Sequence, residues 1–184
     1  ALADSDMIAQ MRDIVASELA PTATPDHAGG LAAALYAGRH VEFFSYGFAD
    51  DATGRKVTPD TLFNLASLRK PFEAALVALG VVRGELRLDD RLPKYLPELN
   101  GTYIRNVTVG QLVTHTSGLL LPTDHPPWPN DEYTRAQFIA MLNAFAPAAS
   151  VAPGRQRIYT HAGYVLLQLV LERWISQADP PQQD

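Results

Sequence analysis

Residues 66–71, "ASLRKP", place a serine three positions before a lysine, with a proline directly behind the lysine. From here the apolar residues follow a helical period, which predicts a helix from Ser67 to about Arg83, with Gly84 as its end. Proline lacks the N–H that a helix interior uses and disfavours helical geometry in the residue before it. Pro71 therefore predicts that the helix begins close to Ser67.

Ser67 and Lys70 allow two interpretations. In the first, Ser67 caps the helix and Lys70 is a solvated charge. In the second, Lys70 accepts the proton of the Ser67 hydroxyl, since a spacing of three on a helix brings the side chains together. Lys70 lies at the positive end of the helix dipole, where a structural lysine is disfavoured, and Arg69 would destabilise its charge further. Chance alone gives about 0.1 such spacings, so the chemical interpretation needs a further partner.

The stretch "RIYTHAGYVLLQLVLE", residues 157–172, contains a candidate partner. Tyr159 stands directly before an apolar segment that predicts a helix over about 161–176. A tyrosine in this position more often packs against apolar neighbours with its hydroxyl in water. Its phenol can also relay protons when a cation such as Lys70 lies nearby. In such an acyl-transfer site the amide of Ser67 would serve as an oxyanion donor.

The other segments predict one helix, one hairpin and then only helices. Two β-like runs, 31–37 and 40–50, flank a short turn at Gly38 and predict an antiparallel hairpin. The prolines of residues 86–99 indicate an irregular connection along the surface. Because a lone hairpin is marginally stable, its sheet looks unfinished. Apolar spacing, with Thr-x-x-Gln capping boxes before the second and third segments, predicts further helices over about 5–19, 109–116 and 134–145.

Composition excludes several classes of function. The net charge of −5 gives no broad positive field, so nucleic acid is not an expected partner. The absence of cysteine excludes disulfides and thiolate chemistry and leaves the compartment open. The longest apolar stretch, residues 164–171, is too short to span a membrane. Residues 1–20 show no signal peptide pattern.

Other kinds of site have weaker support. The five histidines include no His-Glu-x-x-His motif, and a turn and prolines separate His115 from His125, so no metal site is expected. A Ser-His-Asp triad would lack the Gly-x-Ser-x-Gly elbow. Arg155 and Arg157 are interpreted as solvated loop charges, although either would suit a carboxylate.

Three blocks, in this order and spacing, resemble one family. They are "FNLASLRKPF" at 63–72, "VTVGQLVTHTSGL" at 107–119 and "RIYTHAGYVLLQLVLE" at 157–172. Together they resemble the β-lactamase-related serine hydrolases, which include class C β-lactamases, D-alanyl-D-alanine carboxypeptidases and kindred esterases. The resemblance covers about residues 30–175 and includes the hairpin. It implies an α/β (α+β) fold, with an antiparallel sheet flanked by helices and a helical subdomain.

The resemblance implies roles for individual residues. Ser67 would be the acyl-forming nucleophile, Lys70 its proton-accepting partner, and Tyr159 the general base and acid. Ser117, within "HTSGL", would hold a structural turn. The family usually has Tyr-x-Asn, with the amide contacting substrate, whereas here His161 takes the third position. A neutral imidazole has its donor and its acceptor on separate ring nitrogens that point apart, so it cannot present both to one substrate amide as the Asn side chain does, which favours esterase-like activity.

The resemblance also implies how the chain is organised. The family completes its site with a Lys-Thr-Gly or His-Thr-Gly strand, and neither triplet occurs here. We therefore expect an N-terminal portion of a longer enzyme, lacking its C-terminal strands and needing that segment to complete the fold. The expected parts are the first helix and strands at 1–66, a helical subdomain at 67–176, and a disordered tail at 177–184.

These expectations combine into one hypothesis. The chain is expected to carry an acyl-enzyme-forming serine hydrolase site, without metal or organic cofactor, for a small β-lactam or a D-alanyl-D-alanine peptide. An esterase of the same family is one alternative, and a non-catalytic penicillin-binding sensor is another. The resemblance implies a periplasmic or secreted location.

Overall fold

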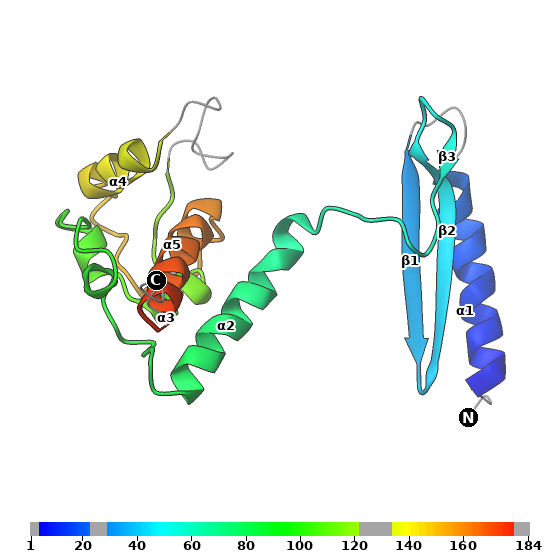
Figure 1. Ribbon diagram of the computed structural model, residues 1–184, viewed down its shortest axis with the longest axis horizontal. Coiled ribbons are helices and arrows are strands. Elements are labelled where there is room, and N and C mark those ends of the chain that lie inside the picture. Colours follow the sequence, from blue (N-terminus) through cyan, green and yellow to red (C-terminus); the bar gives the residue numbers. More distant parts are fainter. Residues whose placement is uncertain (1–3, 23–28, 122–133, 179–184) are drawn as a thin grey trace, which may run out of the picture. The chain divides into compact units, whose positions relative to one another are not determined.

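The structure, a computed structural model, describes residues 4–22, 29–121 and 134–178. The chain divides into two compact units, residues 1–64 and 65–184 (Figure 1). Within the described ranges, no helix combines the length and the apolar character that crossing a membrane requires.

The first unit contains a helix and a small antiparallel sheet. The helix is α1 (Asp4–Leu19), which ends in a 3-10 turn. The strands are β1 (Gly30–Ala37), β2 (His40–Asp50) and β3 (Arg55–Lys56), in the order β1-β2-β3. Helix α1 contacts β1, and Arg12 pairs with Glu42 of β2. The predicted helix and hairpin are confirmed, whereas β3, only two residues long, was not predicted from the sequence.

A two-residue turn sets the register of the hairpin. Ala37 pairs with His40, and Gly30 pairs with Gly47 at the other end. Gly38, in the turn, has φ of 61°, a left-handed conformation that glycine adopts without steric cost.

The second unit is helical. Its α-helices are α2 (Lys70–Val82), α3 (Val109–Val113), α4 (Arg135–Ala144) and α5 (His161–Ala178). Shorter 3-10 turns cover Ala66–Arg69, Leu92–Lys94 and Ile104–Asn106. Both predicted capping boxes are confirmed, with Thr108 and Thr134 as the N-caps. Helix α5 runs two residues further than predicted, so 177 and 178 are helical; 179–184 lie outside the described residues.

Helix α3 is shorter than the predicted 109–116. His115 has φ of 57°, a left-handed conformation that ends the helix, and its amide bonds back to the carbonyl of Leu112. The chain then turns away through the "HTSGL" segment. This turn brings His115 beneath the residues that precede α5.

The core of the second unit forms around α5, which packs against α2 and α3. The prediction that residues 86–99 follow the surface is wrong. Their backbone is irregular, as predicted, but four of their leucines are buried at 2% exposure or less, because these side chains fill the core beside α5. These four are Leu86, Leu92, Leu96 and Leu99.

The start of α2 also differs from expectation. The α-helix begins at Lys70, and Ser67 lies in the preceding 3-10 turn, Ala66–Arg69. Pro71 is the second residue of α2, where its missing N–H costs nothing. Ser67 caps neither segment, since Leu65 and Arg69 hold the N-cap positions. The capping interpretation of Ser67 is therefore wrong.

Candidate active site

Two side chains meet at the Ser67 hydroxyl, one from the same helix start and one from a distant part of the chain. Lys70 Nζ donates a hydrogen bond to Ser67 Oγ at 3.0 Å, and Tyr159 Oη donates to the same oxygen at 2.8 Å. Tyr159 lies 92 positions after Ser67 in the sequence. The structure thus brings together the three residues that the sequence nominated for catalysis, within the reach that proton transfer requires.

The backbone presents Ser67 at the surface. Ala66 has φ of 46°, a left-handed conformation that costs free energy for a residue with a Cβ. The strained residue is the first of the 3-10 turn, Ala66–Arg69, and Ser67, the next residue, remains exposed. A substrate can therefore reach Ser67 Oγ in the unit as described.

Lys70, in contrast, is buried. Only 6% of its surface is exposed, so the interpretation of Lys70 as a solvated charge is wrong. Besides Ser67, its Nζ lies 3.5 Å from His161 Nδ1. The ammonium also lies 5.0 Å from the ring centre of Tyr159 and 5.6 Å from that of Tyr164. Aromatic faces stabilise a cation that has lost much of its hydration.

Tyr159 is positioned by a histidine that the sequence analysis had treated as part of a structural turn. The His115 ring is buried and stacks on Tyr159 and Tyr164, with centroids 4.5 and 4.9 Å apart. Its Nδ1 accepts a hydrogen bond from the amide of Thr160 at 3.4 Å, and its carbonyl accepts from the amide of Ile158 at 2.7 Å. These two hydrogen bonds hold the backbone on either side of Tyr159, and the ring contact holds its side chain.

Arg69, the residue before Lys70, has an acidic partner on its own helix. Its guanidinium lies 3.3 Å from Glu73 Oε1 and 3.4 Å from Gln168 Oε1 on α5. Glu73 therefore offsets the positive charge of Arg69. Burial raises the pKa of Glu73, and the positive charges of Arg69 and Lys70 oppose that rise. Glu73 could not be identified from the sequence, because nothing there distinguishes a buried glutamate from a solvated one in the first turn of a helix.

Ser67, Lys70 and Tyr159 line a cleft of about 550 Å³. Its wall also includes Arg157, which had been interpreted as a solvated loop charge. An exposed guanidinium on the wall of the cleft gives it a group suited to a carboxylate. The remaining lining residues are Leu65, Ala66, Leu68, Pro71, Val113, His115 and Tyr164.

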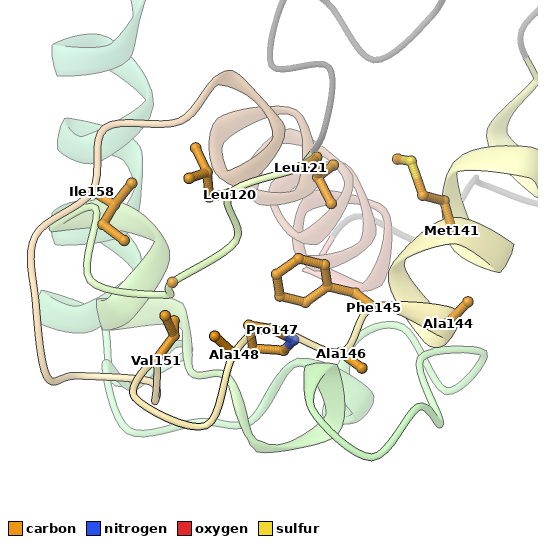
Figure 2. Close-up of a pocket in the computed structure, with 11 residues that line it drawn as sticks. Leu120, Leu121, Met141, Ala144, Phe145, Ala146, Pro147, Ala148, Val151 and Ile158 are labelled. Atoms are coloured by element: carbon orange, nitrogen blue, oxygen red, sulfur yellow. The ribbon is translucent and has the colours of Figure 1, made fainter.

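A second cavity of similar size lies in the same unit. Figure 2 shows this cavity of about 540 Å³, which has only apolar side chains and one glycine along its wall. Leu121 lines it from the segment after α3, and Met141 and Phe145 line it from α4 and the residue directly after it (Figure 2). It has no nucleophile and no titratable side chain in its lining, so it cannot be the centre of acyl transfer.

Two further sequence expectations concern serine and histidine side chains. Ser117 is 1% exposed, and its carbonyl accepts a hydrogen bond from Tyr103 Oη at 3.0 Å, so it is inaccessible to a substrate. Across residues 4–22, 29–121 and 134–178, no group of three histidine or acidic side chains is arranged to hold a metal ion. His125 lies outside these ranges.

Comparison with known proteins identifies relatives. The family model described as Beta-lactamase matches residues 13–177. A beta-lactamase of Escherichia coli K12 is 33% identical over 154 residues, which are 83% of this chain and 39% of that protein. A beta-lactamase of Pseudomonas fluorescens is 30% identical over 82% of this chain and 40% of that protein. The chain thus spans about two fifths of the length of these curated relatives.

Solved structures agree with the sequence comparison. A class C beta-lactamase superposes with a TM-score of 0.77 at 32% identity, covering 91% of this chain and 45% of that one. A D-alanine carboxypeptidase from Burkholderia cenocepacia gives 0.73 at 34% identity, with 91% and 44% covered. The predicted α/β (α+β) fold class of the β-lactamase type is confirmed. Because the Beta-lactamase family model matches residues 13–177, the chain belongs to the beta-lactamase family.

Proposed function

We propose that this chain carries the nucleophile of a serine acyl hydrolase that works through an acyl-enzyme. One observation carries the proposal: Ser67 Oγ is exposed and receives hydrogen bonds from Lys70 Nζ and Tyr159 Oη. Both are groups that can hold or move a proton, and both are fixed by burial or stacking. No metal or organic cofactor enters the proposal, because an activated serine needs only a proton acceptor and oxyanion donors.

Acylation forms a bond between Ser67 Oγ and the carbonyl carbon, breaks the C–N bond of the substrate, and moves one proton from Ser67 to the leaving nitrogen. Ser67 Oγ bonds to the carbonyl carbon while its proton passes to the base of the cluster, which is Lys70 as a free amine or Tyr159 as a phenolate. The C–N bond of an amide or lactam then breaks, and Tyr159 gives a proton to the leaving nitrogen. In deacylation, water attacks the ester carbonyl and gives a proton to Tyr159. The ester C–O bond breaks, and that proton returns to Ser67 Oγ.

The relatives suggest the substrate class. We propose a β-lactam or a D-alanyl-D-alanine peptide, both of which carry a carboxylate near the reactive carbonyl. Arg157 on the wall of the cleft supports this class, since a guanidinium pairs with carboxylates. We also propose that the complete protein contributes a further strand to the site, and that it works in the periplasm or outside the cell.

An esterase is the second candidate, and His161 favours it. Its Nδ1 lies 3.5 Å from Lys70 Nζ, and its ring stands edge-on to Tyr159 at 5.4 Å. His161 thus occupies the side of the cluster where the family usually has an amide. With Nδ1 directed at Lys70 Nζ, a neutral imidazole can offer a substrate only its Nε2, as one donor or one acceptor. An ester, which has no N–H, needs less from that position than a peptide does.

Intact mass spectrometry tests the proposal. We would mix the full-length protein with a penicillin, a D-alanyl-D-alanine peptide or a short-chain ester and follow the protein mass over time. A transient adduct on Ser67 with product release supports hydrolysis of that substrate. A permanent penicillin adduct without turnover of any substrate would instead indicate a sensor. Turnover without any dependence on Ser67 would overturn the proposal.

A further inference from the structure

His115 has a backbone conformation that is strained for a residue with a Cβ. Its φ is 57°, in the left-handed region, where glycine meets no steric penalty. Gly84, which follows α2, and Gly118, in the same turn as His115, are in this region with φ of 71° and 72°. Strained residues of this kind are retained where the side chain has a role that glycine could not fill. The conformation of His115 therefore calls for a role of its side chain.

His115 accepts two hydrogen bonds, one from each side of Tyr159. The amide of Ile158 donates to the His115 carbonyl at 2.7 Å, and the amide of Thr160 donates to His115 Nδ1 at 3.4 Å. Thr160 is 1% exposed, and its Oγ1 accepts from the amide of Gly163 in the first turn of α5. A glycine at position 115 would keep the bond to the carbonyl and lose the bond to the side chain.

The His115 ring also lies between two tyrosine rings. It is buried, and its centroid lies 4.5 Å from that of Tyr159 and 4.9 Å from that of Tyr164, with tilts of 35° and 32°. Both tyrosine rings contact the Lys70 ammonium, which lies 5.0 and 5.6 Å from their centres. The imidazole therefore sets the spacing of the two aromatic faces that surround Lys70.

The hydroxyl of Tyr159 needs such support. Tyr159 is 43% exposed and belongs to the irregular segment that precedes α5, so neither burial nor a regular element fixes its ring. Its Oη must nevertheless lie 2.8 Å from Ser67 Oγ, which comes from the other end of the unit's sequence. A misplacement of about 1 Å in a reacting group is enough to lower a rate about 100-fold.

We propose that His115 is a positioning residue that sets kcat through Tyr159, by holding the phenol where its hydroxyl reaches Ser67 Oγ. The inference rests on the proposed acyl-enzyme function. A purely structural role, in which His115 only ends α3 and shapes the "HTSGL" turn, predicts an effect on stability that is independent of the Tyr159 hydroxyl. Positioning predicts a lower kcat that disappears as an effect once that hydroxyl is absent.

Variants of the full-length protein remove the two side-chain contacts separately. His115→Phe keeps a flat ring and removes the Nδ1 acceptor, whereas His115→Asn keeps a short acceptor in a residue that tolerates the left-handed region. Each should lower kcat about 10- to 100-fold and change KM less than about threefold, with the substrate found by mass spectrometry. His115→Gly, which removes both contacts, should lower kcat most. A parent-like kcat in folded His115→Gly would overturn the inference.

A double variant separates positioning from structure. In the Tyr159→Phe background, His115→Phe should lower kcat no more than about twofold further, because the hydroxyl that His115 holds is already gone. Two losses that multiply would show that His115 acts on the turn as a whole, and the inference would fail. Tyr103→Phe is the matched control, since it removes a hydrogen bond to the carbonyl of Ser117 in the same turn. It should leave kcat within about twofold of the parent value.

Amide hydrogen exchange, followed by NMR, needs no activity. In His115→Phe the Thr160 amide loses its acceptor and should exchange at least about tenfold faster. The Ile158 amide is the reference, because its acceptor is the backbone carbonyl that the substitution keeps. An equal rise at both amides, or no rise at Thr160, would overturn the inference. If the parent protein hydrolyses no substrate, the proposed function fails while the exchange still decides whether His115 holds this segment.

The test does not depend on one variant. If His115→Phe does not fold, His115→Asn takes its place in the double variant and His115→Gly takes its place in the exchange measurement. The criteria stay the same: a kcat effect that requires the Tyr159 hydroxyl and faster exchange at Thr160 than at Ile158 support the role of His115. Failure of either one overturns it.

Discussion

The Ser67–Lys70 pair and the Thr108–Gln111 pair both place a hydroxyl three residues before a longer polar side chain at a helix start. At Thr108 the hydroxyl accepts from the amide of Gln111 at 3.3 Å, and the Gln111 side chain accepts from the amide of Thr108 at 3.0 Å. At Ser67 the hydroxyl caps nothing and is held by two side chains, Lys70 and Tyr159. The same spacing thus stabilises a helix in one place and, in the proposed mechanism, prepares a nucleophile in the other.

The difference lies in the backbone and in burial. Thr108 is in the extended conformation of an N-cap, so its oxygen faces the free amides of α3. Ser67 lies inside a 3-10 turn, and the α-helix begins only at Lys70. The partner of Thr108 bonds to backbone, whereas the partner of Ser67 is a buried ammonium. A hydroxyl at a helix start that does not cap the helix, such as that of Ser67, is therefore a candidate for a catalytic role.

The largest expected effect is that of Ser67→Ala. Losing the nucleophile should lower kcat about 10⁴-fold or more, because the other residues of the cluster cannot form the acyl-enzyme. Since Ser67 is exposed and caps no helix, the unfolding free energy should change by less than about 0.5 kcal/mol. Assays with the substrate found by mass spectrometry and urea denaturation check both. A loss of stability as large as that expected for a cap mutant would show that Ser67, like Thr108, stabilises its helix.

Tyr159→Phe should have the next largest effect. The phenylalanine keeps the stacking on His115 but loses the hydroxyl that contacts Ser67 Oγ. Loss of a general acid and base lowers kcat about 10²- to 10⁴-fold. Single-turnover kinetics would measure the fall in acylation and deacylation separately. Unchanged rates would show that Tyr159 only packs beside the serine.

Thr108→Ala should show the reverse pattern. Losing the capping hydroxyl should cost about 1 kcal/mol of unfolding free energy. The value of kcat should stay within a factor of about two, because the change affects stability and does not touch the cluster. Urea denaturation beside the hydrolysis assay would measure both. A kcat that falls with Thr108→Ala, at a temperature where the variant is folded, would show that the two helix starts are coupled.

Asp90→Asn tests a related contrast, between Lys94, which pairs with a carboxylate, and Lys70, which contacts Ser67. Lys94 Nζ and Tyr95 Oη donate to Asp90 Oδ2 at 2.7 and 2.5 Å. Burial tends to raise the pKa of Asp90, but the hydrogen bonds from Lys94 and Tyr95 outweigh it and lower the pKa. A carboxylate with a lowered folded-state pKa stabilises the fold above its unfolded value of about 4, and this stability is lost as the pH falls through the folded value.

The expected result follows from that sign. At pH 7, Asp90→Asn should lower the unfolding free energy by about 1 kcal/mol. As the pH falls through the lowered folded-state pKa of Asp90, the parent protein should approach the variant, because Asp90 then becomes protonated in both the folded and the unfolded chain. Urea denaturation at a series of pH values measures the difference. A gap that stays constant down to pH 2 would contradict the assigned role of Asp90.

Local patterns in the sequence were sufficient to predict several elements. The capping boxes at Thr108 and Thr134, the hairpin around Gly38 and helix α5 could be predicted because neighbouring residues determine them. The connection at 86–99 was wrongly placed on the surface, since its prolines indicated a loop but could not show that its leucines fill the core. Strand β3 is too short for a periodic pattern.

The sequence by itself determined which residues could take part in the chemistry. The spacing of Ser67 and Lys70 is local, and Tyr159 was identified from its own motif. The tertiary structure alone decided that Lys70 is buried, that Tyr159 reaches Ser67 Oγ, and that Glu73 carries an enclosed carboxylate. The reason is physical: the charge state and reactivity of a side chain depend on desolvation and on charges nearby in space, which folding brings together from distant positions.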